Sequence, residues 1–219
     1  MLQDLAFGRL DNHYEDHAPK KGDIVLCMQG NGILVARDKL DALTLPNGSF
    51  LPTPNAWEKI QDVAYIQQTA LNAVNSLLQK HPDTARIGIT GNSGGGTATY
   101  YTACLDERIK LAVPSCAVCT YKHSIAAMRH CVCNFIPNIA TYFDMGDLAG
   151  LIAPRKLVVV NGKDVPIFPE AGVQESYEVI KKMYAAAGVP DNCALVTGNG
   201  AHRFYADDAW PVLHKMMGK

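Results

Sequence analysis

The sequence has almost no net charge and no long apolar run. Its 20 Lys and Arg residues nearly balance 21 Asp and Glu residues, which gives a formal net charge of -1 over 219 residues. Without a basic run there is no electrostatic footprint for nucleic acid or for an anionic membrane surface. No apolar stretch is long enough to span a bilayer, and Met1–Leu10 lacks the charged and apolar regions of a signal peptide. We therefore expect a cytoplasmic protein without nucleic-acid or membrane partners.

The cysteine content does not indicate a disulfide framework either. The chain has 7 cysteines, an odd number, and they lie among apolar residues. Reduced thiols are the expected state for such a pattern in a cytosolic protein. A composition of 48% hydrophobic and 19% charged residues suits a soluble domain with a sizeable core. We expect one domain over residues 1–219 and no cofactor.

The most informative stretch is Arg86–Gly96, a short β-branched run that ends in a Gly-x-Ser-x-Gly motif around Ser93. The residues that follow, Thr97–Leu105, can continue as a helix. A strand that turns sharply into a helix places its corner residue in a strained conformation, and the neighbouring glycines allow the helix to pack close behind it. No Lys-Ser/Thr follows the glycines, so the motif does not match a phosphate-binding loop. The pattern is typical of the nucleophile elbow of α/β-hydrolases, which exposes a serine hydroxyl above a sheet.

Strand and helix patterns alternate on both sides of this motif. Strands are predicted over Gly22–Met28, Leu111–Val113, Leu157–Gly162 and Cys193–Thr197. Helices are predicted from Asn55 to Lys80, where apolar residues recur at three- and four-residue steps, and over Val173–Tyr184, before Gly188 and Pro190. This alternation predicts an α/β fold with a mainly parallel sheet and helices on both faces. Residues 1–21 are polar and poorly periodic, and we expect a solvated arm.

A serine hydroxyl becomes a good nucleophile only when a base removes its proton and an acid orients that base. Of the 7 histidines, His202 is best placed, because it follows the last predicted strand. Ligands of open α/β sheets bind beyond the C-terminal ends of the strands. Asp164 follows the preceding strand, and it is the only carboxylate there before Glu170. The order Ser93, Asp164, His202 matches that of hydrolases, whereas a surface loop histidine is the alternative interpretation of His202.

Six short motifs follow one another along the chain: Gly91–Thr97, Leu105–Ile109, His130–Asn134, Ala153–Arg155, Pro166–Pro169 and His202–Phe204. Together they resemble the acetyl xylan esterase-like and dienelactone hydrolase-like branch of the α/β-hydrolases, from about Trp57 to the C-terminus. The resemblance implies an α/β-hydrolase fold and an esterase with Ser93 as nucleophile and His202 as base. It also implies short acyl groups, such as acetyl on a sugar, as the substrate.

Two features depart from the pattern of that family. The acidic residue usually stands directly before the Pro-Ile-Phe-Pro stretch, where this chain has Val165, and the aspartate lies one residue earlier. Asp164 therefore serves as the triad acid, or the triad is weakened. The N-terminal part is shorter than in the family, and Gln29–Gly32 is either a reduced oxyanion turn or follows another strand. The backbone amide of Gly94 is the predicted oxyanion donor.

Residues 115–150 break the alternating pattern with a Cys- and His-rich insertion that we expect to cap the active site. Its cysteines and histidines are numerous enough for a zinc site, although their spacing is not that of a standard finger. The residues concerned are Cys116, Cys119, His123, His130, Cys131 and Cys133. Buried free thiols are favoured over zinc, so no metal is predicted. Phe135, Tyr142 and Phe143 are expected to form the acyl or alcohol pocket.

The sequence as a whole predicts a serine hydrolase that cleaves carboxylic esters of small molecules. Its predicted site consists of Ser93, His202 and Asp164, with Gly94 in the oxyanion hole. One alternative is a catalytically weakened relative that acts as a binding protein, and another is an interaction module stabilised by zinc. The oligomeric state stays open, including a homo-oligomer in which a second subunit completes the shortened front.

Overall fold

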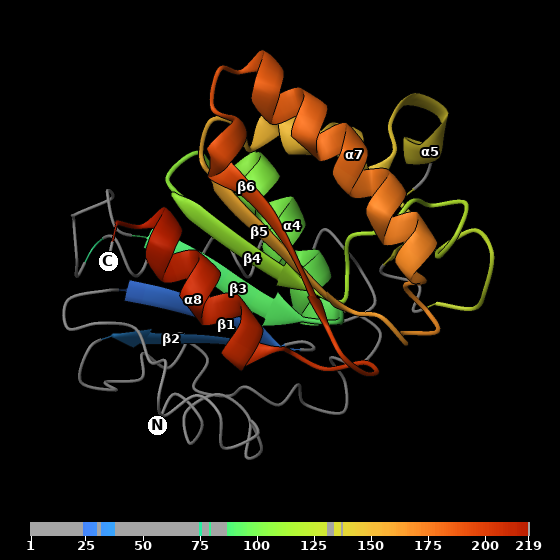
Figure 1. Cartoon of the computed structure of the whole chain (residues 1–219), viewed down its shortest axis with the longest axis horizontal. Coiled ribbons are helices and arrows are strands. Elements are labelled where there is room, and N and C mark those ends of the chain that lie inside the picture. Colours follow the sequence, from blue (N-terminus) through green and yellow to red (C-terminus); the bar gives the residue numbers. More distant parts are fainter. Residues whose placement is uncertain are drawn as a thin grey trace.

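A six-stranded sheet with the strand order β2-β1-β3-β4-β5-β6 lies at the centre of the molecule (Figure 1). The computed structural model describes residues 24–29, 32–37, 75, 79, 87–130, 134–136 and 138–218. The strands are β1 Ile24–Gln29, β2 Gly32–Arg37, β3 Ile87–Asn92, β4 Leu111–Ser115, β5 Lys156–Gly162 and β6 Cys193–Gly198. The β1 and β2 strands are antiparallel, and every other neighbouring pair is parallel. The predicted mainly parallel sheet is confirmed.

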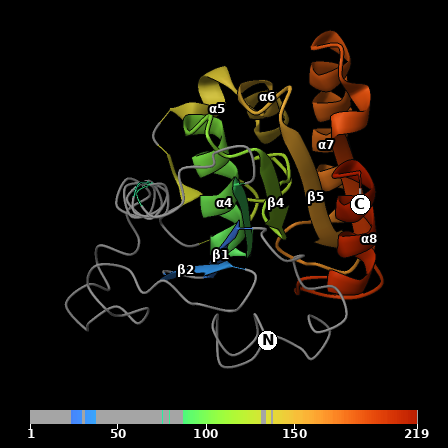
Figure 2. The same ribbon diagram turned by 90° about the vertical axis from the view of Figure 1, so that its left-hand side faces the viewer.

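Helices cover both faces of this sheet, as predicted. They are α4 Gly94–Leu105, α5 Ile139–Tyr142, α6 Met145–Leu148, α7 Glu170–Ala186 and α8 Ala206–Met216, with short 3-10 turns at Ala149–Leu151 and Pro190–Asn192. Figure 2 shows strands β4 and β5 between α4 on one side and α8 on the other.

The β5 strand shows why a continuous β-branched run suits this architecture. Its successive side chains point to opposite faces, and all of them from Leu157 to Val160 are buried. Leu157 and Val159 pack in the cluster that contains residues of α4, α6 and α7, whereas Val158 and Val160 pack in the cluster formed with α8. The core therefore consists of two layers separated by the sheet.

The α7 helix ends at the glycine that the sequence indicates. Gly188 has a φ of 75°, and its N–H donates to the carbonyl of Ala185 at 3.0 Å. The N–H of Val189 donates to the carbonyl of Tyr184 at 3.0 Å. These two bonds form a Schellman motif, which satisfies carbonyls that the helix itself leaves free. The apolar face predicted for this helix is buried at Val173, Ile180 and Tyr184.

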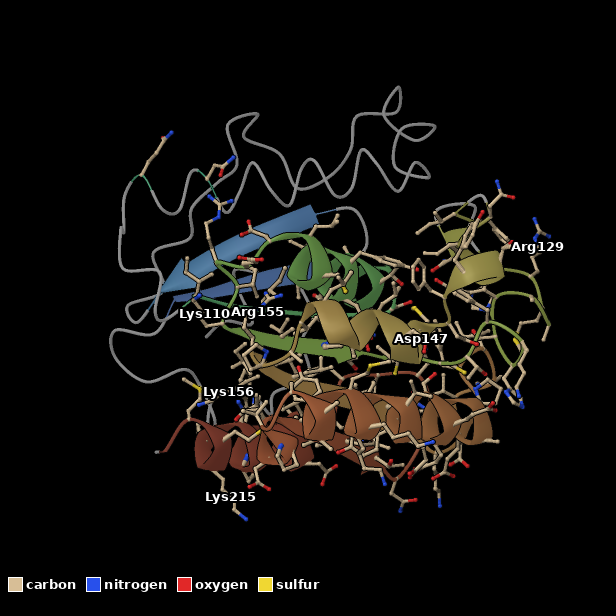
Figure 3. All side chains as sticks on the ribbon, turned by 90° about the horizontal axis from the view of Figure 1, so that it is seen from above. Lys110, Arg129, Asp147, Arg155, Lys156 and Lys215 are labelled. Atoms are coloured by element: carbon tan, nitrogen blue, oxygen red, sulfur yellow. The ribbon has the colours of Figure 1, made fainter. Side chains whose placement is uncertain are left out.

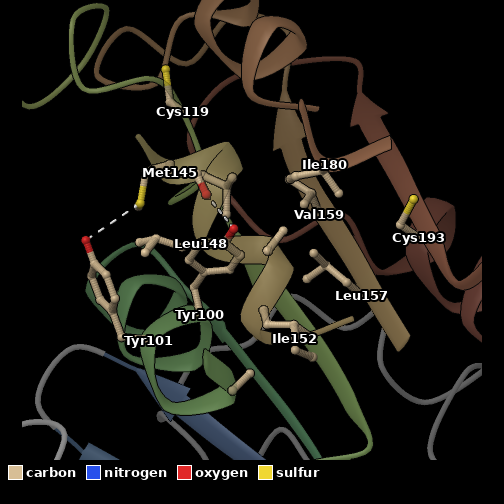
Figure 4. Packing of buried hydrophobic residues seen from close by; sticks show 14 of the residues in the cluster. Tyr100, Tyr101, Cys119, Met145, Leu148, Ile152, Leu157, Val159, Ile180 and Cys193 are labelled. Carbon is tan, nitrogen blue, oxygen red and sulfur yellow. Dashed lines mark hydrogen bonds between the residues drawn. The ribbon is translucent and has the colours of Figure 1, made fainter. Parts of the chain in front are cut away.

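The end of the predicted insertion, around α6, belongs to the core. The hydroxyl of Tyr100 on α4 donates to the carbonyl of Met145 on α6 at 2.6 Å (Figure 4). The neighbouring Tyr101 hydroxyl lies 2.8 Å from the Tyr121 hydroxyl and 3.7 Å from the sulfur of Met145. Met145 and Leu148 are buried between α4 and α7. The α6 helix is thus fixed by apolar burial and by hydrogen bonds of buried phenols.

Two consecutive cations attach helices to the sheet on opposite faces. The guanidinium of Arg155 donates to four backbone carbonyls at the C-terminal end of α4 and in the loops beside it, those of Ala103, Asp106, Ile109 and Leu151. The ammonium of Lys156 donates to the carbonyl of Met216 at the end of α8. Positive charge is favourable at the C-terminus of a helix, where free carbonyls carry partial negative charge. Figure 3 shows both side chains at the end of the sheet away from Arg129.

Some predictions lie outside the described residues. They are the polar arm over residues 1–21 and most of the helix from Asn55 to Lys80, of which only Asn75 and Gln79 are described, both in helical conformation. Within the described ranges, no helix combines the length and the apolar character needed to cross a bilayer.

The close approach of α4 to β4 depends on Gly96. A Cβ atom at this position would lie 2.3 Å from the carbonyl oxygen of Ser115 and 2.8 Å from the Cβ atom of Ala117. We expect Gly96→Ala to lower the free energy of unfolding by about 1–3 kcal/mol, the usual range for an overpacked core. Urea denaturation followed by circular dichroism measures the change. Gly88→Ala is the matched control, because its Cβ would meet its nearest neighbour at 3.7 Å. Equal stability of the two variants would contradict the packing argument.

Candidate active site

Ser93 occupies the sharp turn between β3 and α4. Its backbone has φ 58° and ψ -124°, a region that costs a residue other than glycine about 1–3 kcal/mol. Two hydrogen bonds of 2.9 Å hold this conformation: its N–H donates to the carbonyl of Ser115, and its carbonyl accepts from the N–H of Thr97. The side chain is half-buried. The predicted strand–turn–helix arrangement is confirmed, and it leaves the serine at the C-terminal edge of the sheet.

The first residue of α4 is Gly94, whose amide is the predicted oxyanion donor. N–H groups in the first turn of a helix have no partner within the helix and carry partial positive charge. No backbone carbonyl of the described residues accepts from the amide of Gly94. In the register of the sheet, Gln29 lies opposite Asn92, so β1 ends beside the serine turn. Residues 30 and 31 lie outside the described residues, and a second donor from this turn stays a prediction.

The loop that carries His202 is tied to the same edge of the sheet by Ser115 and Cys116. The Ser115 hydroxyl lies 2.8 Å from the side-chain oxygen of Asn92 and 3.5 Å from the carbonyl of Arg203. The Cys116 thiol lies 3.4 Å from the same carbonyl. The carbonyl of Ser115 accepts from the amide of Ser93, so one residue links the serine turn to the histidine loop.

Tyr205 gives the histidine loop its shape, a role that its own position in the sequence does not indicate. Its hydroxyl donates to the carbonyl of Ala201 at 2.5 Å, across the histidine. Its ring occupies the space above Gly198, where a Cβ atom would lie 1.9 Å from the ring. The guanidinium of Arg203 lies 4.8 Å from the centre of the ring. The glycine at position 198 is the only sequence signal that a ring packs on the end of β6.

The imidazole of His202 stacks on the ring of Phe168. The ring centres are 6.2 Å apart and the planes differ by 15°. The histidine is otherwise exposed, whereas Phe168 is buried. The partial loss of water around the imidazole lowers the pKa of His202 below its usual value of 6.5. This shift favours the neutral imidazole, which is the state that a general base requires.

Asp164 lies beside the histidine loop but does not bind the histidine. Its N–H donates to the carbonyl of Gly200 at 3.0 Å, and the N–H of Lys163 donates to the carbonyl of Gly198 at 3.0 Å. The Asp164 side chain is exposed, and the next residue, Val165, is buried. No hydrogen bond joins the side chains of Ser93, Asp164 and His202, all three of which the structure describes. The loops are adjacent, and the role of Asp164 as triad acid stays a prediction.

A buried asparagine closes the loop between β5 and α7. The side-chain amide of Asn161 donates to the carbonyl of Gly162 at 2.8 Å and to that of Phe168 at 3.1 Å. Gly162 and Phe168, which carry these two carbonyls, lie at the two ends of the loop that contains Asp164. Because one rigid amide binds both ends, the loop and the ring of Phe168 have a fixed position relative to the sheet.

The histidines of the predicted insertion are bound to hydroxyl groups. The Nε2 atom of His130 lies 3.0 Å from the hydroxyl of Ser124, and Nδ1 of His123 lies 2.7 Å from the hydroxyl of Thr120. Burial raises the pKa of the Cys119 thiol to about 12, so the thiol is protonated at neutral pH. Among the residues that the structure describes, no group of His, Cys, Asp and Glu could hold a metal. Cys131 and Cys133 lie outside those residues.

The aromatic residues predicted to form a pocket lie at the surface instead. Phe135 is 50% exposed, Tyr142 is 74% exposed and Phe143 is 52% exposed. These exposures leave the acyl or alcohol pocket expected from the three side chains a prediction. The α5 helix that carries Tyr142 has only four residues and none of them is buried, so its aromatic side chain faces water.

Comparisons with known proteins support the fold. No protein-family model matches the chain. The chain is 30% identical over 141 residues to the Bacillus subtilis (strain 168) protein named "Putative hydrolase YtaP", a match that covers 63% of this chain and 46% of the relative. A carbohydrate esterase family 15 glucuronoyl esterase from Caldicellulosiruptor kristjansonii superposes with a TM-score of 0.63 at 16% identity, over 96% of this chain and 72% of that one. The chain has the α/β-hydrolase fold.

A second curated relative of the chain is the 4-O-methyl-glucuronoyl methylesterase of Phanerochaete carnosa (strain HHB-10118-sp). It is 26% identical over 164 residues, which cover 64% of this chain and 40% of the relative. The chain thus spans less than half the length of the two curated relatives that it matches. The fold predicted from the sequence is confirmed, whereas the acetyl xylan esterase-like branch stays a prediction.

The lowered pKa of His202 is open to direct measurement. We expect the imidazole of His202 to titrate below 6.5 in a two-dimensional NMR experiment, because burial disfavours the charged form. The His202→Gln variant assigns the signal, and a short peptide Ala-His-Arg gives the reference in water. A pKa at or above that of the peptide would contradict the described environment of the ring.

Proposed function

We propose that this α/β-hydrolase is a serine esterase that cleaves carboxylic esters. The observation that carries the proposal is the strained Ser93 turn, which Ser115 links to the His202 loop. Strained backbone is retained where the surrounding structure fixes it, and a serine exposed in this way at a helix N-terminus suits nucleophilic attack.

In the proposed reaction, the Ser93 oxygen attacks the ester carbonyl while His202 takes the hydroxyl proton. The amide of Gly94 donates a hydrogen bond to the oxyanion of the tetrahedral intermediate. His202 then gives the proton to the alcohol as the carbon–oxygen bond breaks, which leaves an acyl group on Ser93. Water, deprotonated by His202, releases the acid and restores the serine. No cofactor takes part in this sequence of steps.

The substrate class that we propose is an ester of a carbohydrate, first of all a short acyl ester such as an acetylated sugar. This class rests on the resemblance of the sequence motifs. Two of the three proteins described above carry the names of esterases of glucuronic acid derivatives. The two classes place the sugar on opposite sides of the ester bond: an acetylated sugar leaves as the alcohol, whereas a glucuronoyl group stays on the serine. Turnover of acetylated xylan and of methyl glucuronate separates them.

A second candidate function is that of a weakened relative that binds ligands without turnover. It is favoured by one observation, the exposed Asp164 carboxylate that makes no hydrogen bond with His202. A base without an acid partner is less well oriented and its cation is less stabilised. The two candidates differ in one result, because only the esterase forms a covalent adduct with a fluorophosphonate.

Ser93→Ala should abolish hydrolysis of p-nitrophenyl acetate and labelling by a fluorophosphonate, because it deletes the attacking oxygen. Thermal unfolding should stay close to that of the wild type, since the side chain is half-buried and makes no described hydrogen bond. Thr141→Ala is the matched control, because it removes an exposed hydroxyl from α5. Full turnover in the Ser93 variant would end the proposal, and an unlabelled wild type would favour the binding protein.

Asp164→Asn should lower kcat by less than about tenfold, because the exposed carboxylate does not bind His202. A triad aspartate that loses its charge costs about 10⁴-fold. Asp208→Asn, which neutralises another exposed carboxylate on α8, is the control. A loss of three or more orders of magnitude would show that Asp164 approaches His202 during catalysis and completes the triad.

A further inference from the structure

Phe168 contacts two histidines that come from different parts of the chain. The ring of His202 stacks on the ring of Phe168, with 6.2 Å between the ring centres. The ring of His130 meets the same phenyl ring edge to face, with 5.4 Å between the ring centres and an angle of 60° between the planes. His130 belongs to the insertion, and His202 belongs to the loop after β6. The buried Phe168 is thus in contact both with the proposed base and with a hydrogen-bonded histidine.

The hydrogen bonds around His130 place a proton on its Nε2 atom and fix the backbone beside Phe168. The Ser124 hydroxyl donates to the carbonyl of Ile167 at 2.5 Å, so its one proton is used. The contact of 3.0 Å between this hydroxyl and Nε2 of His130 then requires the imidazole N–H as donor. Burial lowers the pKa of His130, which favours the neutral imidazole. Its tautomer with the proton on Nε2 is the one that donates to the Ser124 hydroxyl. The residue before Phe168 is therefore held by the insertion.

The other side of Phe168 is held by the sheet. Its carbonyl accepts from the buried amide of Asn161, which also binds Gly162. The ring is 3% exposed and packs in the core cluster with Val165 and Val173. A ring fixed from both directions forms a rigid flat surface for the otherwise exposed imidazole.

We propose that Phe168 is the positioning residue of His202, holding the imidazole by stacking in the role that a triad carboxylate plays elsewhere. The inference rests on the proposed function and deepens it. An acid partner orients a catalytic histidine by a hydrogen bond to one ring nitrogen. A stacked ring restricts the plane of the imidazole instead, and it excludes water from one of its faces. The loop after β5 thus constrains the orientation of the His202 imidazole through Phe168, which lies four residues beyond Asp164.

Other titratable and charged groups near the histidine loop belong to every element that packs against it. They are Lys163 and Asp164 from the loop after β5, Cys116 directly after β4, Tyr205 before α8 and Arg203 from the same loop, whereas His130 of the insertion contacts Phe168. Loss of water is the cause that lowers the pKa of His202. A change of Phe168 that admits water should therefore raise this pKa toward 6.5, whereas a change elsewhere in the core should not.

The first test uses the wild-type protein and needs no activity. Nuclear Overhauser contacts between the ring protons of Phe168 and those of His202 should be present in solution. Their absence would overturn the proposal, whatever the protein hydrolyses.

The second test compares Phe168→Met, which keeps an apolar side chain of similar length without the ring, with Ile180→Ala, a core substitution on α7. In Phe168→Met we expect the NMR pKa of His202 to rise toward 6.5 and the acid limb of kcat/KM for p-nitrophenyl acetate to move to higher pH with it. We expect kcat to fall about 10- to 100-fold at pH 8 with KM nearly unchanged, the scale of a misplaced catalytic group. Ile180→Ala should lower the melting temperature but leave the histidine pKa and kcat as they are.

Two results would overturn the proposal: an unchanged His202 pKa in folded Phe168→Met, or an equal fall of kcat in Ile180→Ala. If Phe168→Met does not fold, Phe168→Leu takes its place, and the ring contacts in the wild type still decide. If the wild type hydrolyses no ester, the NMR pKa of His202 in the variants still tests the stacking, and the failure then belongs to the proposed function alone.

Discussion

The hydrogen bond from the amide of Ser93 to the carbonyl of Ser115 is the constraint on which the site depends. It joins the turn after β3 to the end of β4 and holds a backbone conformation that serine alone does not favour. The bond requires α4 to pass very close to β4, which only the missing side chain of Gly96 permits. The hydroxyl of Ser115 then reaches Asn92 and the carbonyl of Arg203, so the histidine loop is built on the same residue.

The sequence predicted those elements whose signal is local. The β5 strand is a β-branched run, the end of α7 is marked by a glycine at positive φ, and the serine turn is a short motif between strand and helix patterns. Each of these follows from side-chain periodicity or from a backbone requirement within a few residues. The order of Asp164 and His202 along the chain also placed their loops correctly, because parallel strands end at one edge of the sheet.

The remaining features depend on contacts between distant residues. The stack of Phe168 on His202 joins positions 34 residues apart, and nothing in either motif indicates which ring meets which. The packing of Tyr205 over Gly198 is a tertiary contact of the same kind. The insertion is expected to be a cap because its sequence breaks the alternating pattern. The burial of α6 through Met145 was not foreseen, because the contacts of Met145 with Tyr100 have no local signature. Even the side chain of Asp164 faces water for a tertiary reason, since the core takes up Val165 beside it.

The position of α8 has a consequence for how the protein responds to heat. This helix begins at Ala206, four residues after His202, and it packs on one face of β5 and β6 through Trp210 and Leu213. The histidine loop is therefore a short span anchored at one end by a strand and at the other by a helix that holds on mainly through apolar contacts. Partial detachment of α8 would let the histidine loop move while the helices on the opposite face of the sheet stay packed. His202 would lose its position first, so the protein would lose activity at a lower temperature than the one at which the sheet unfolds.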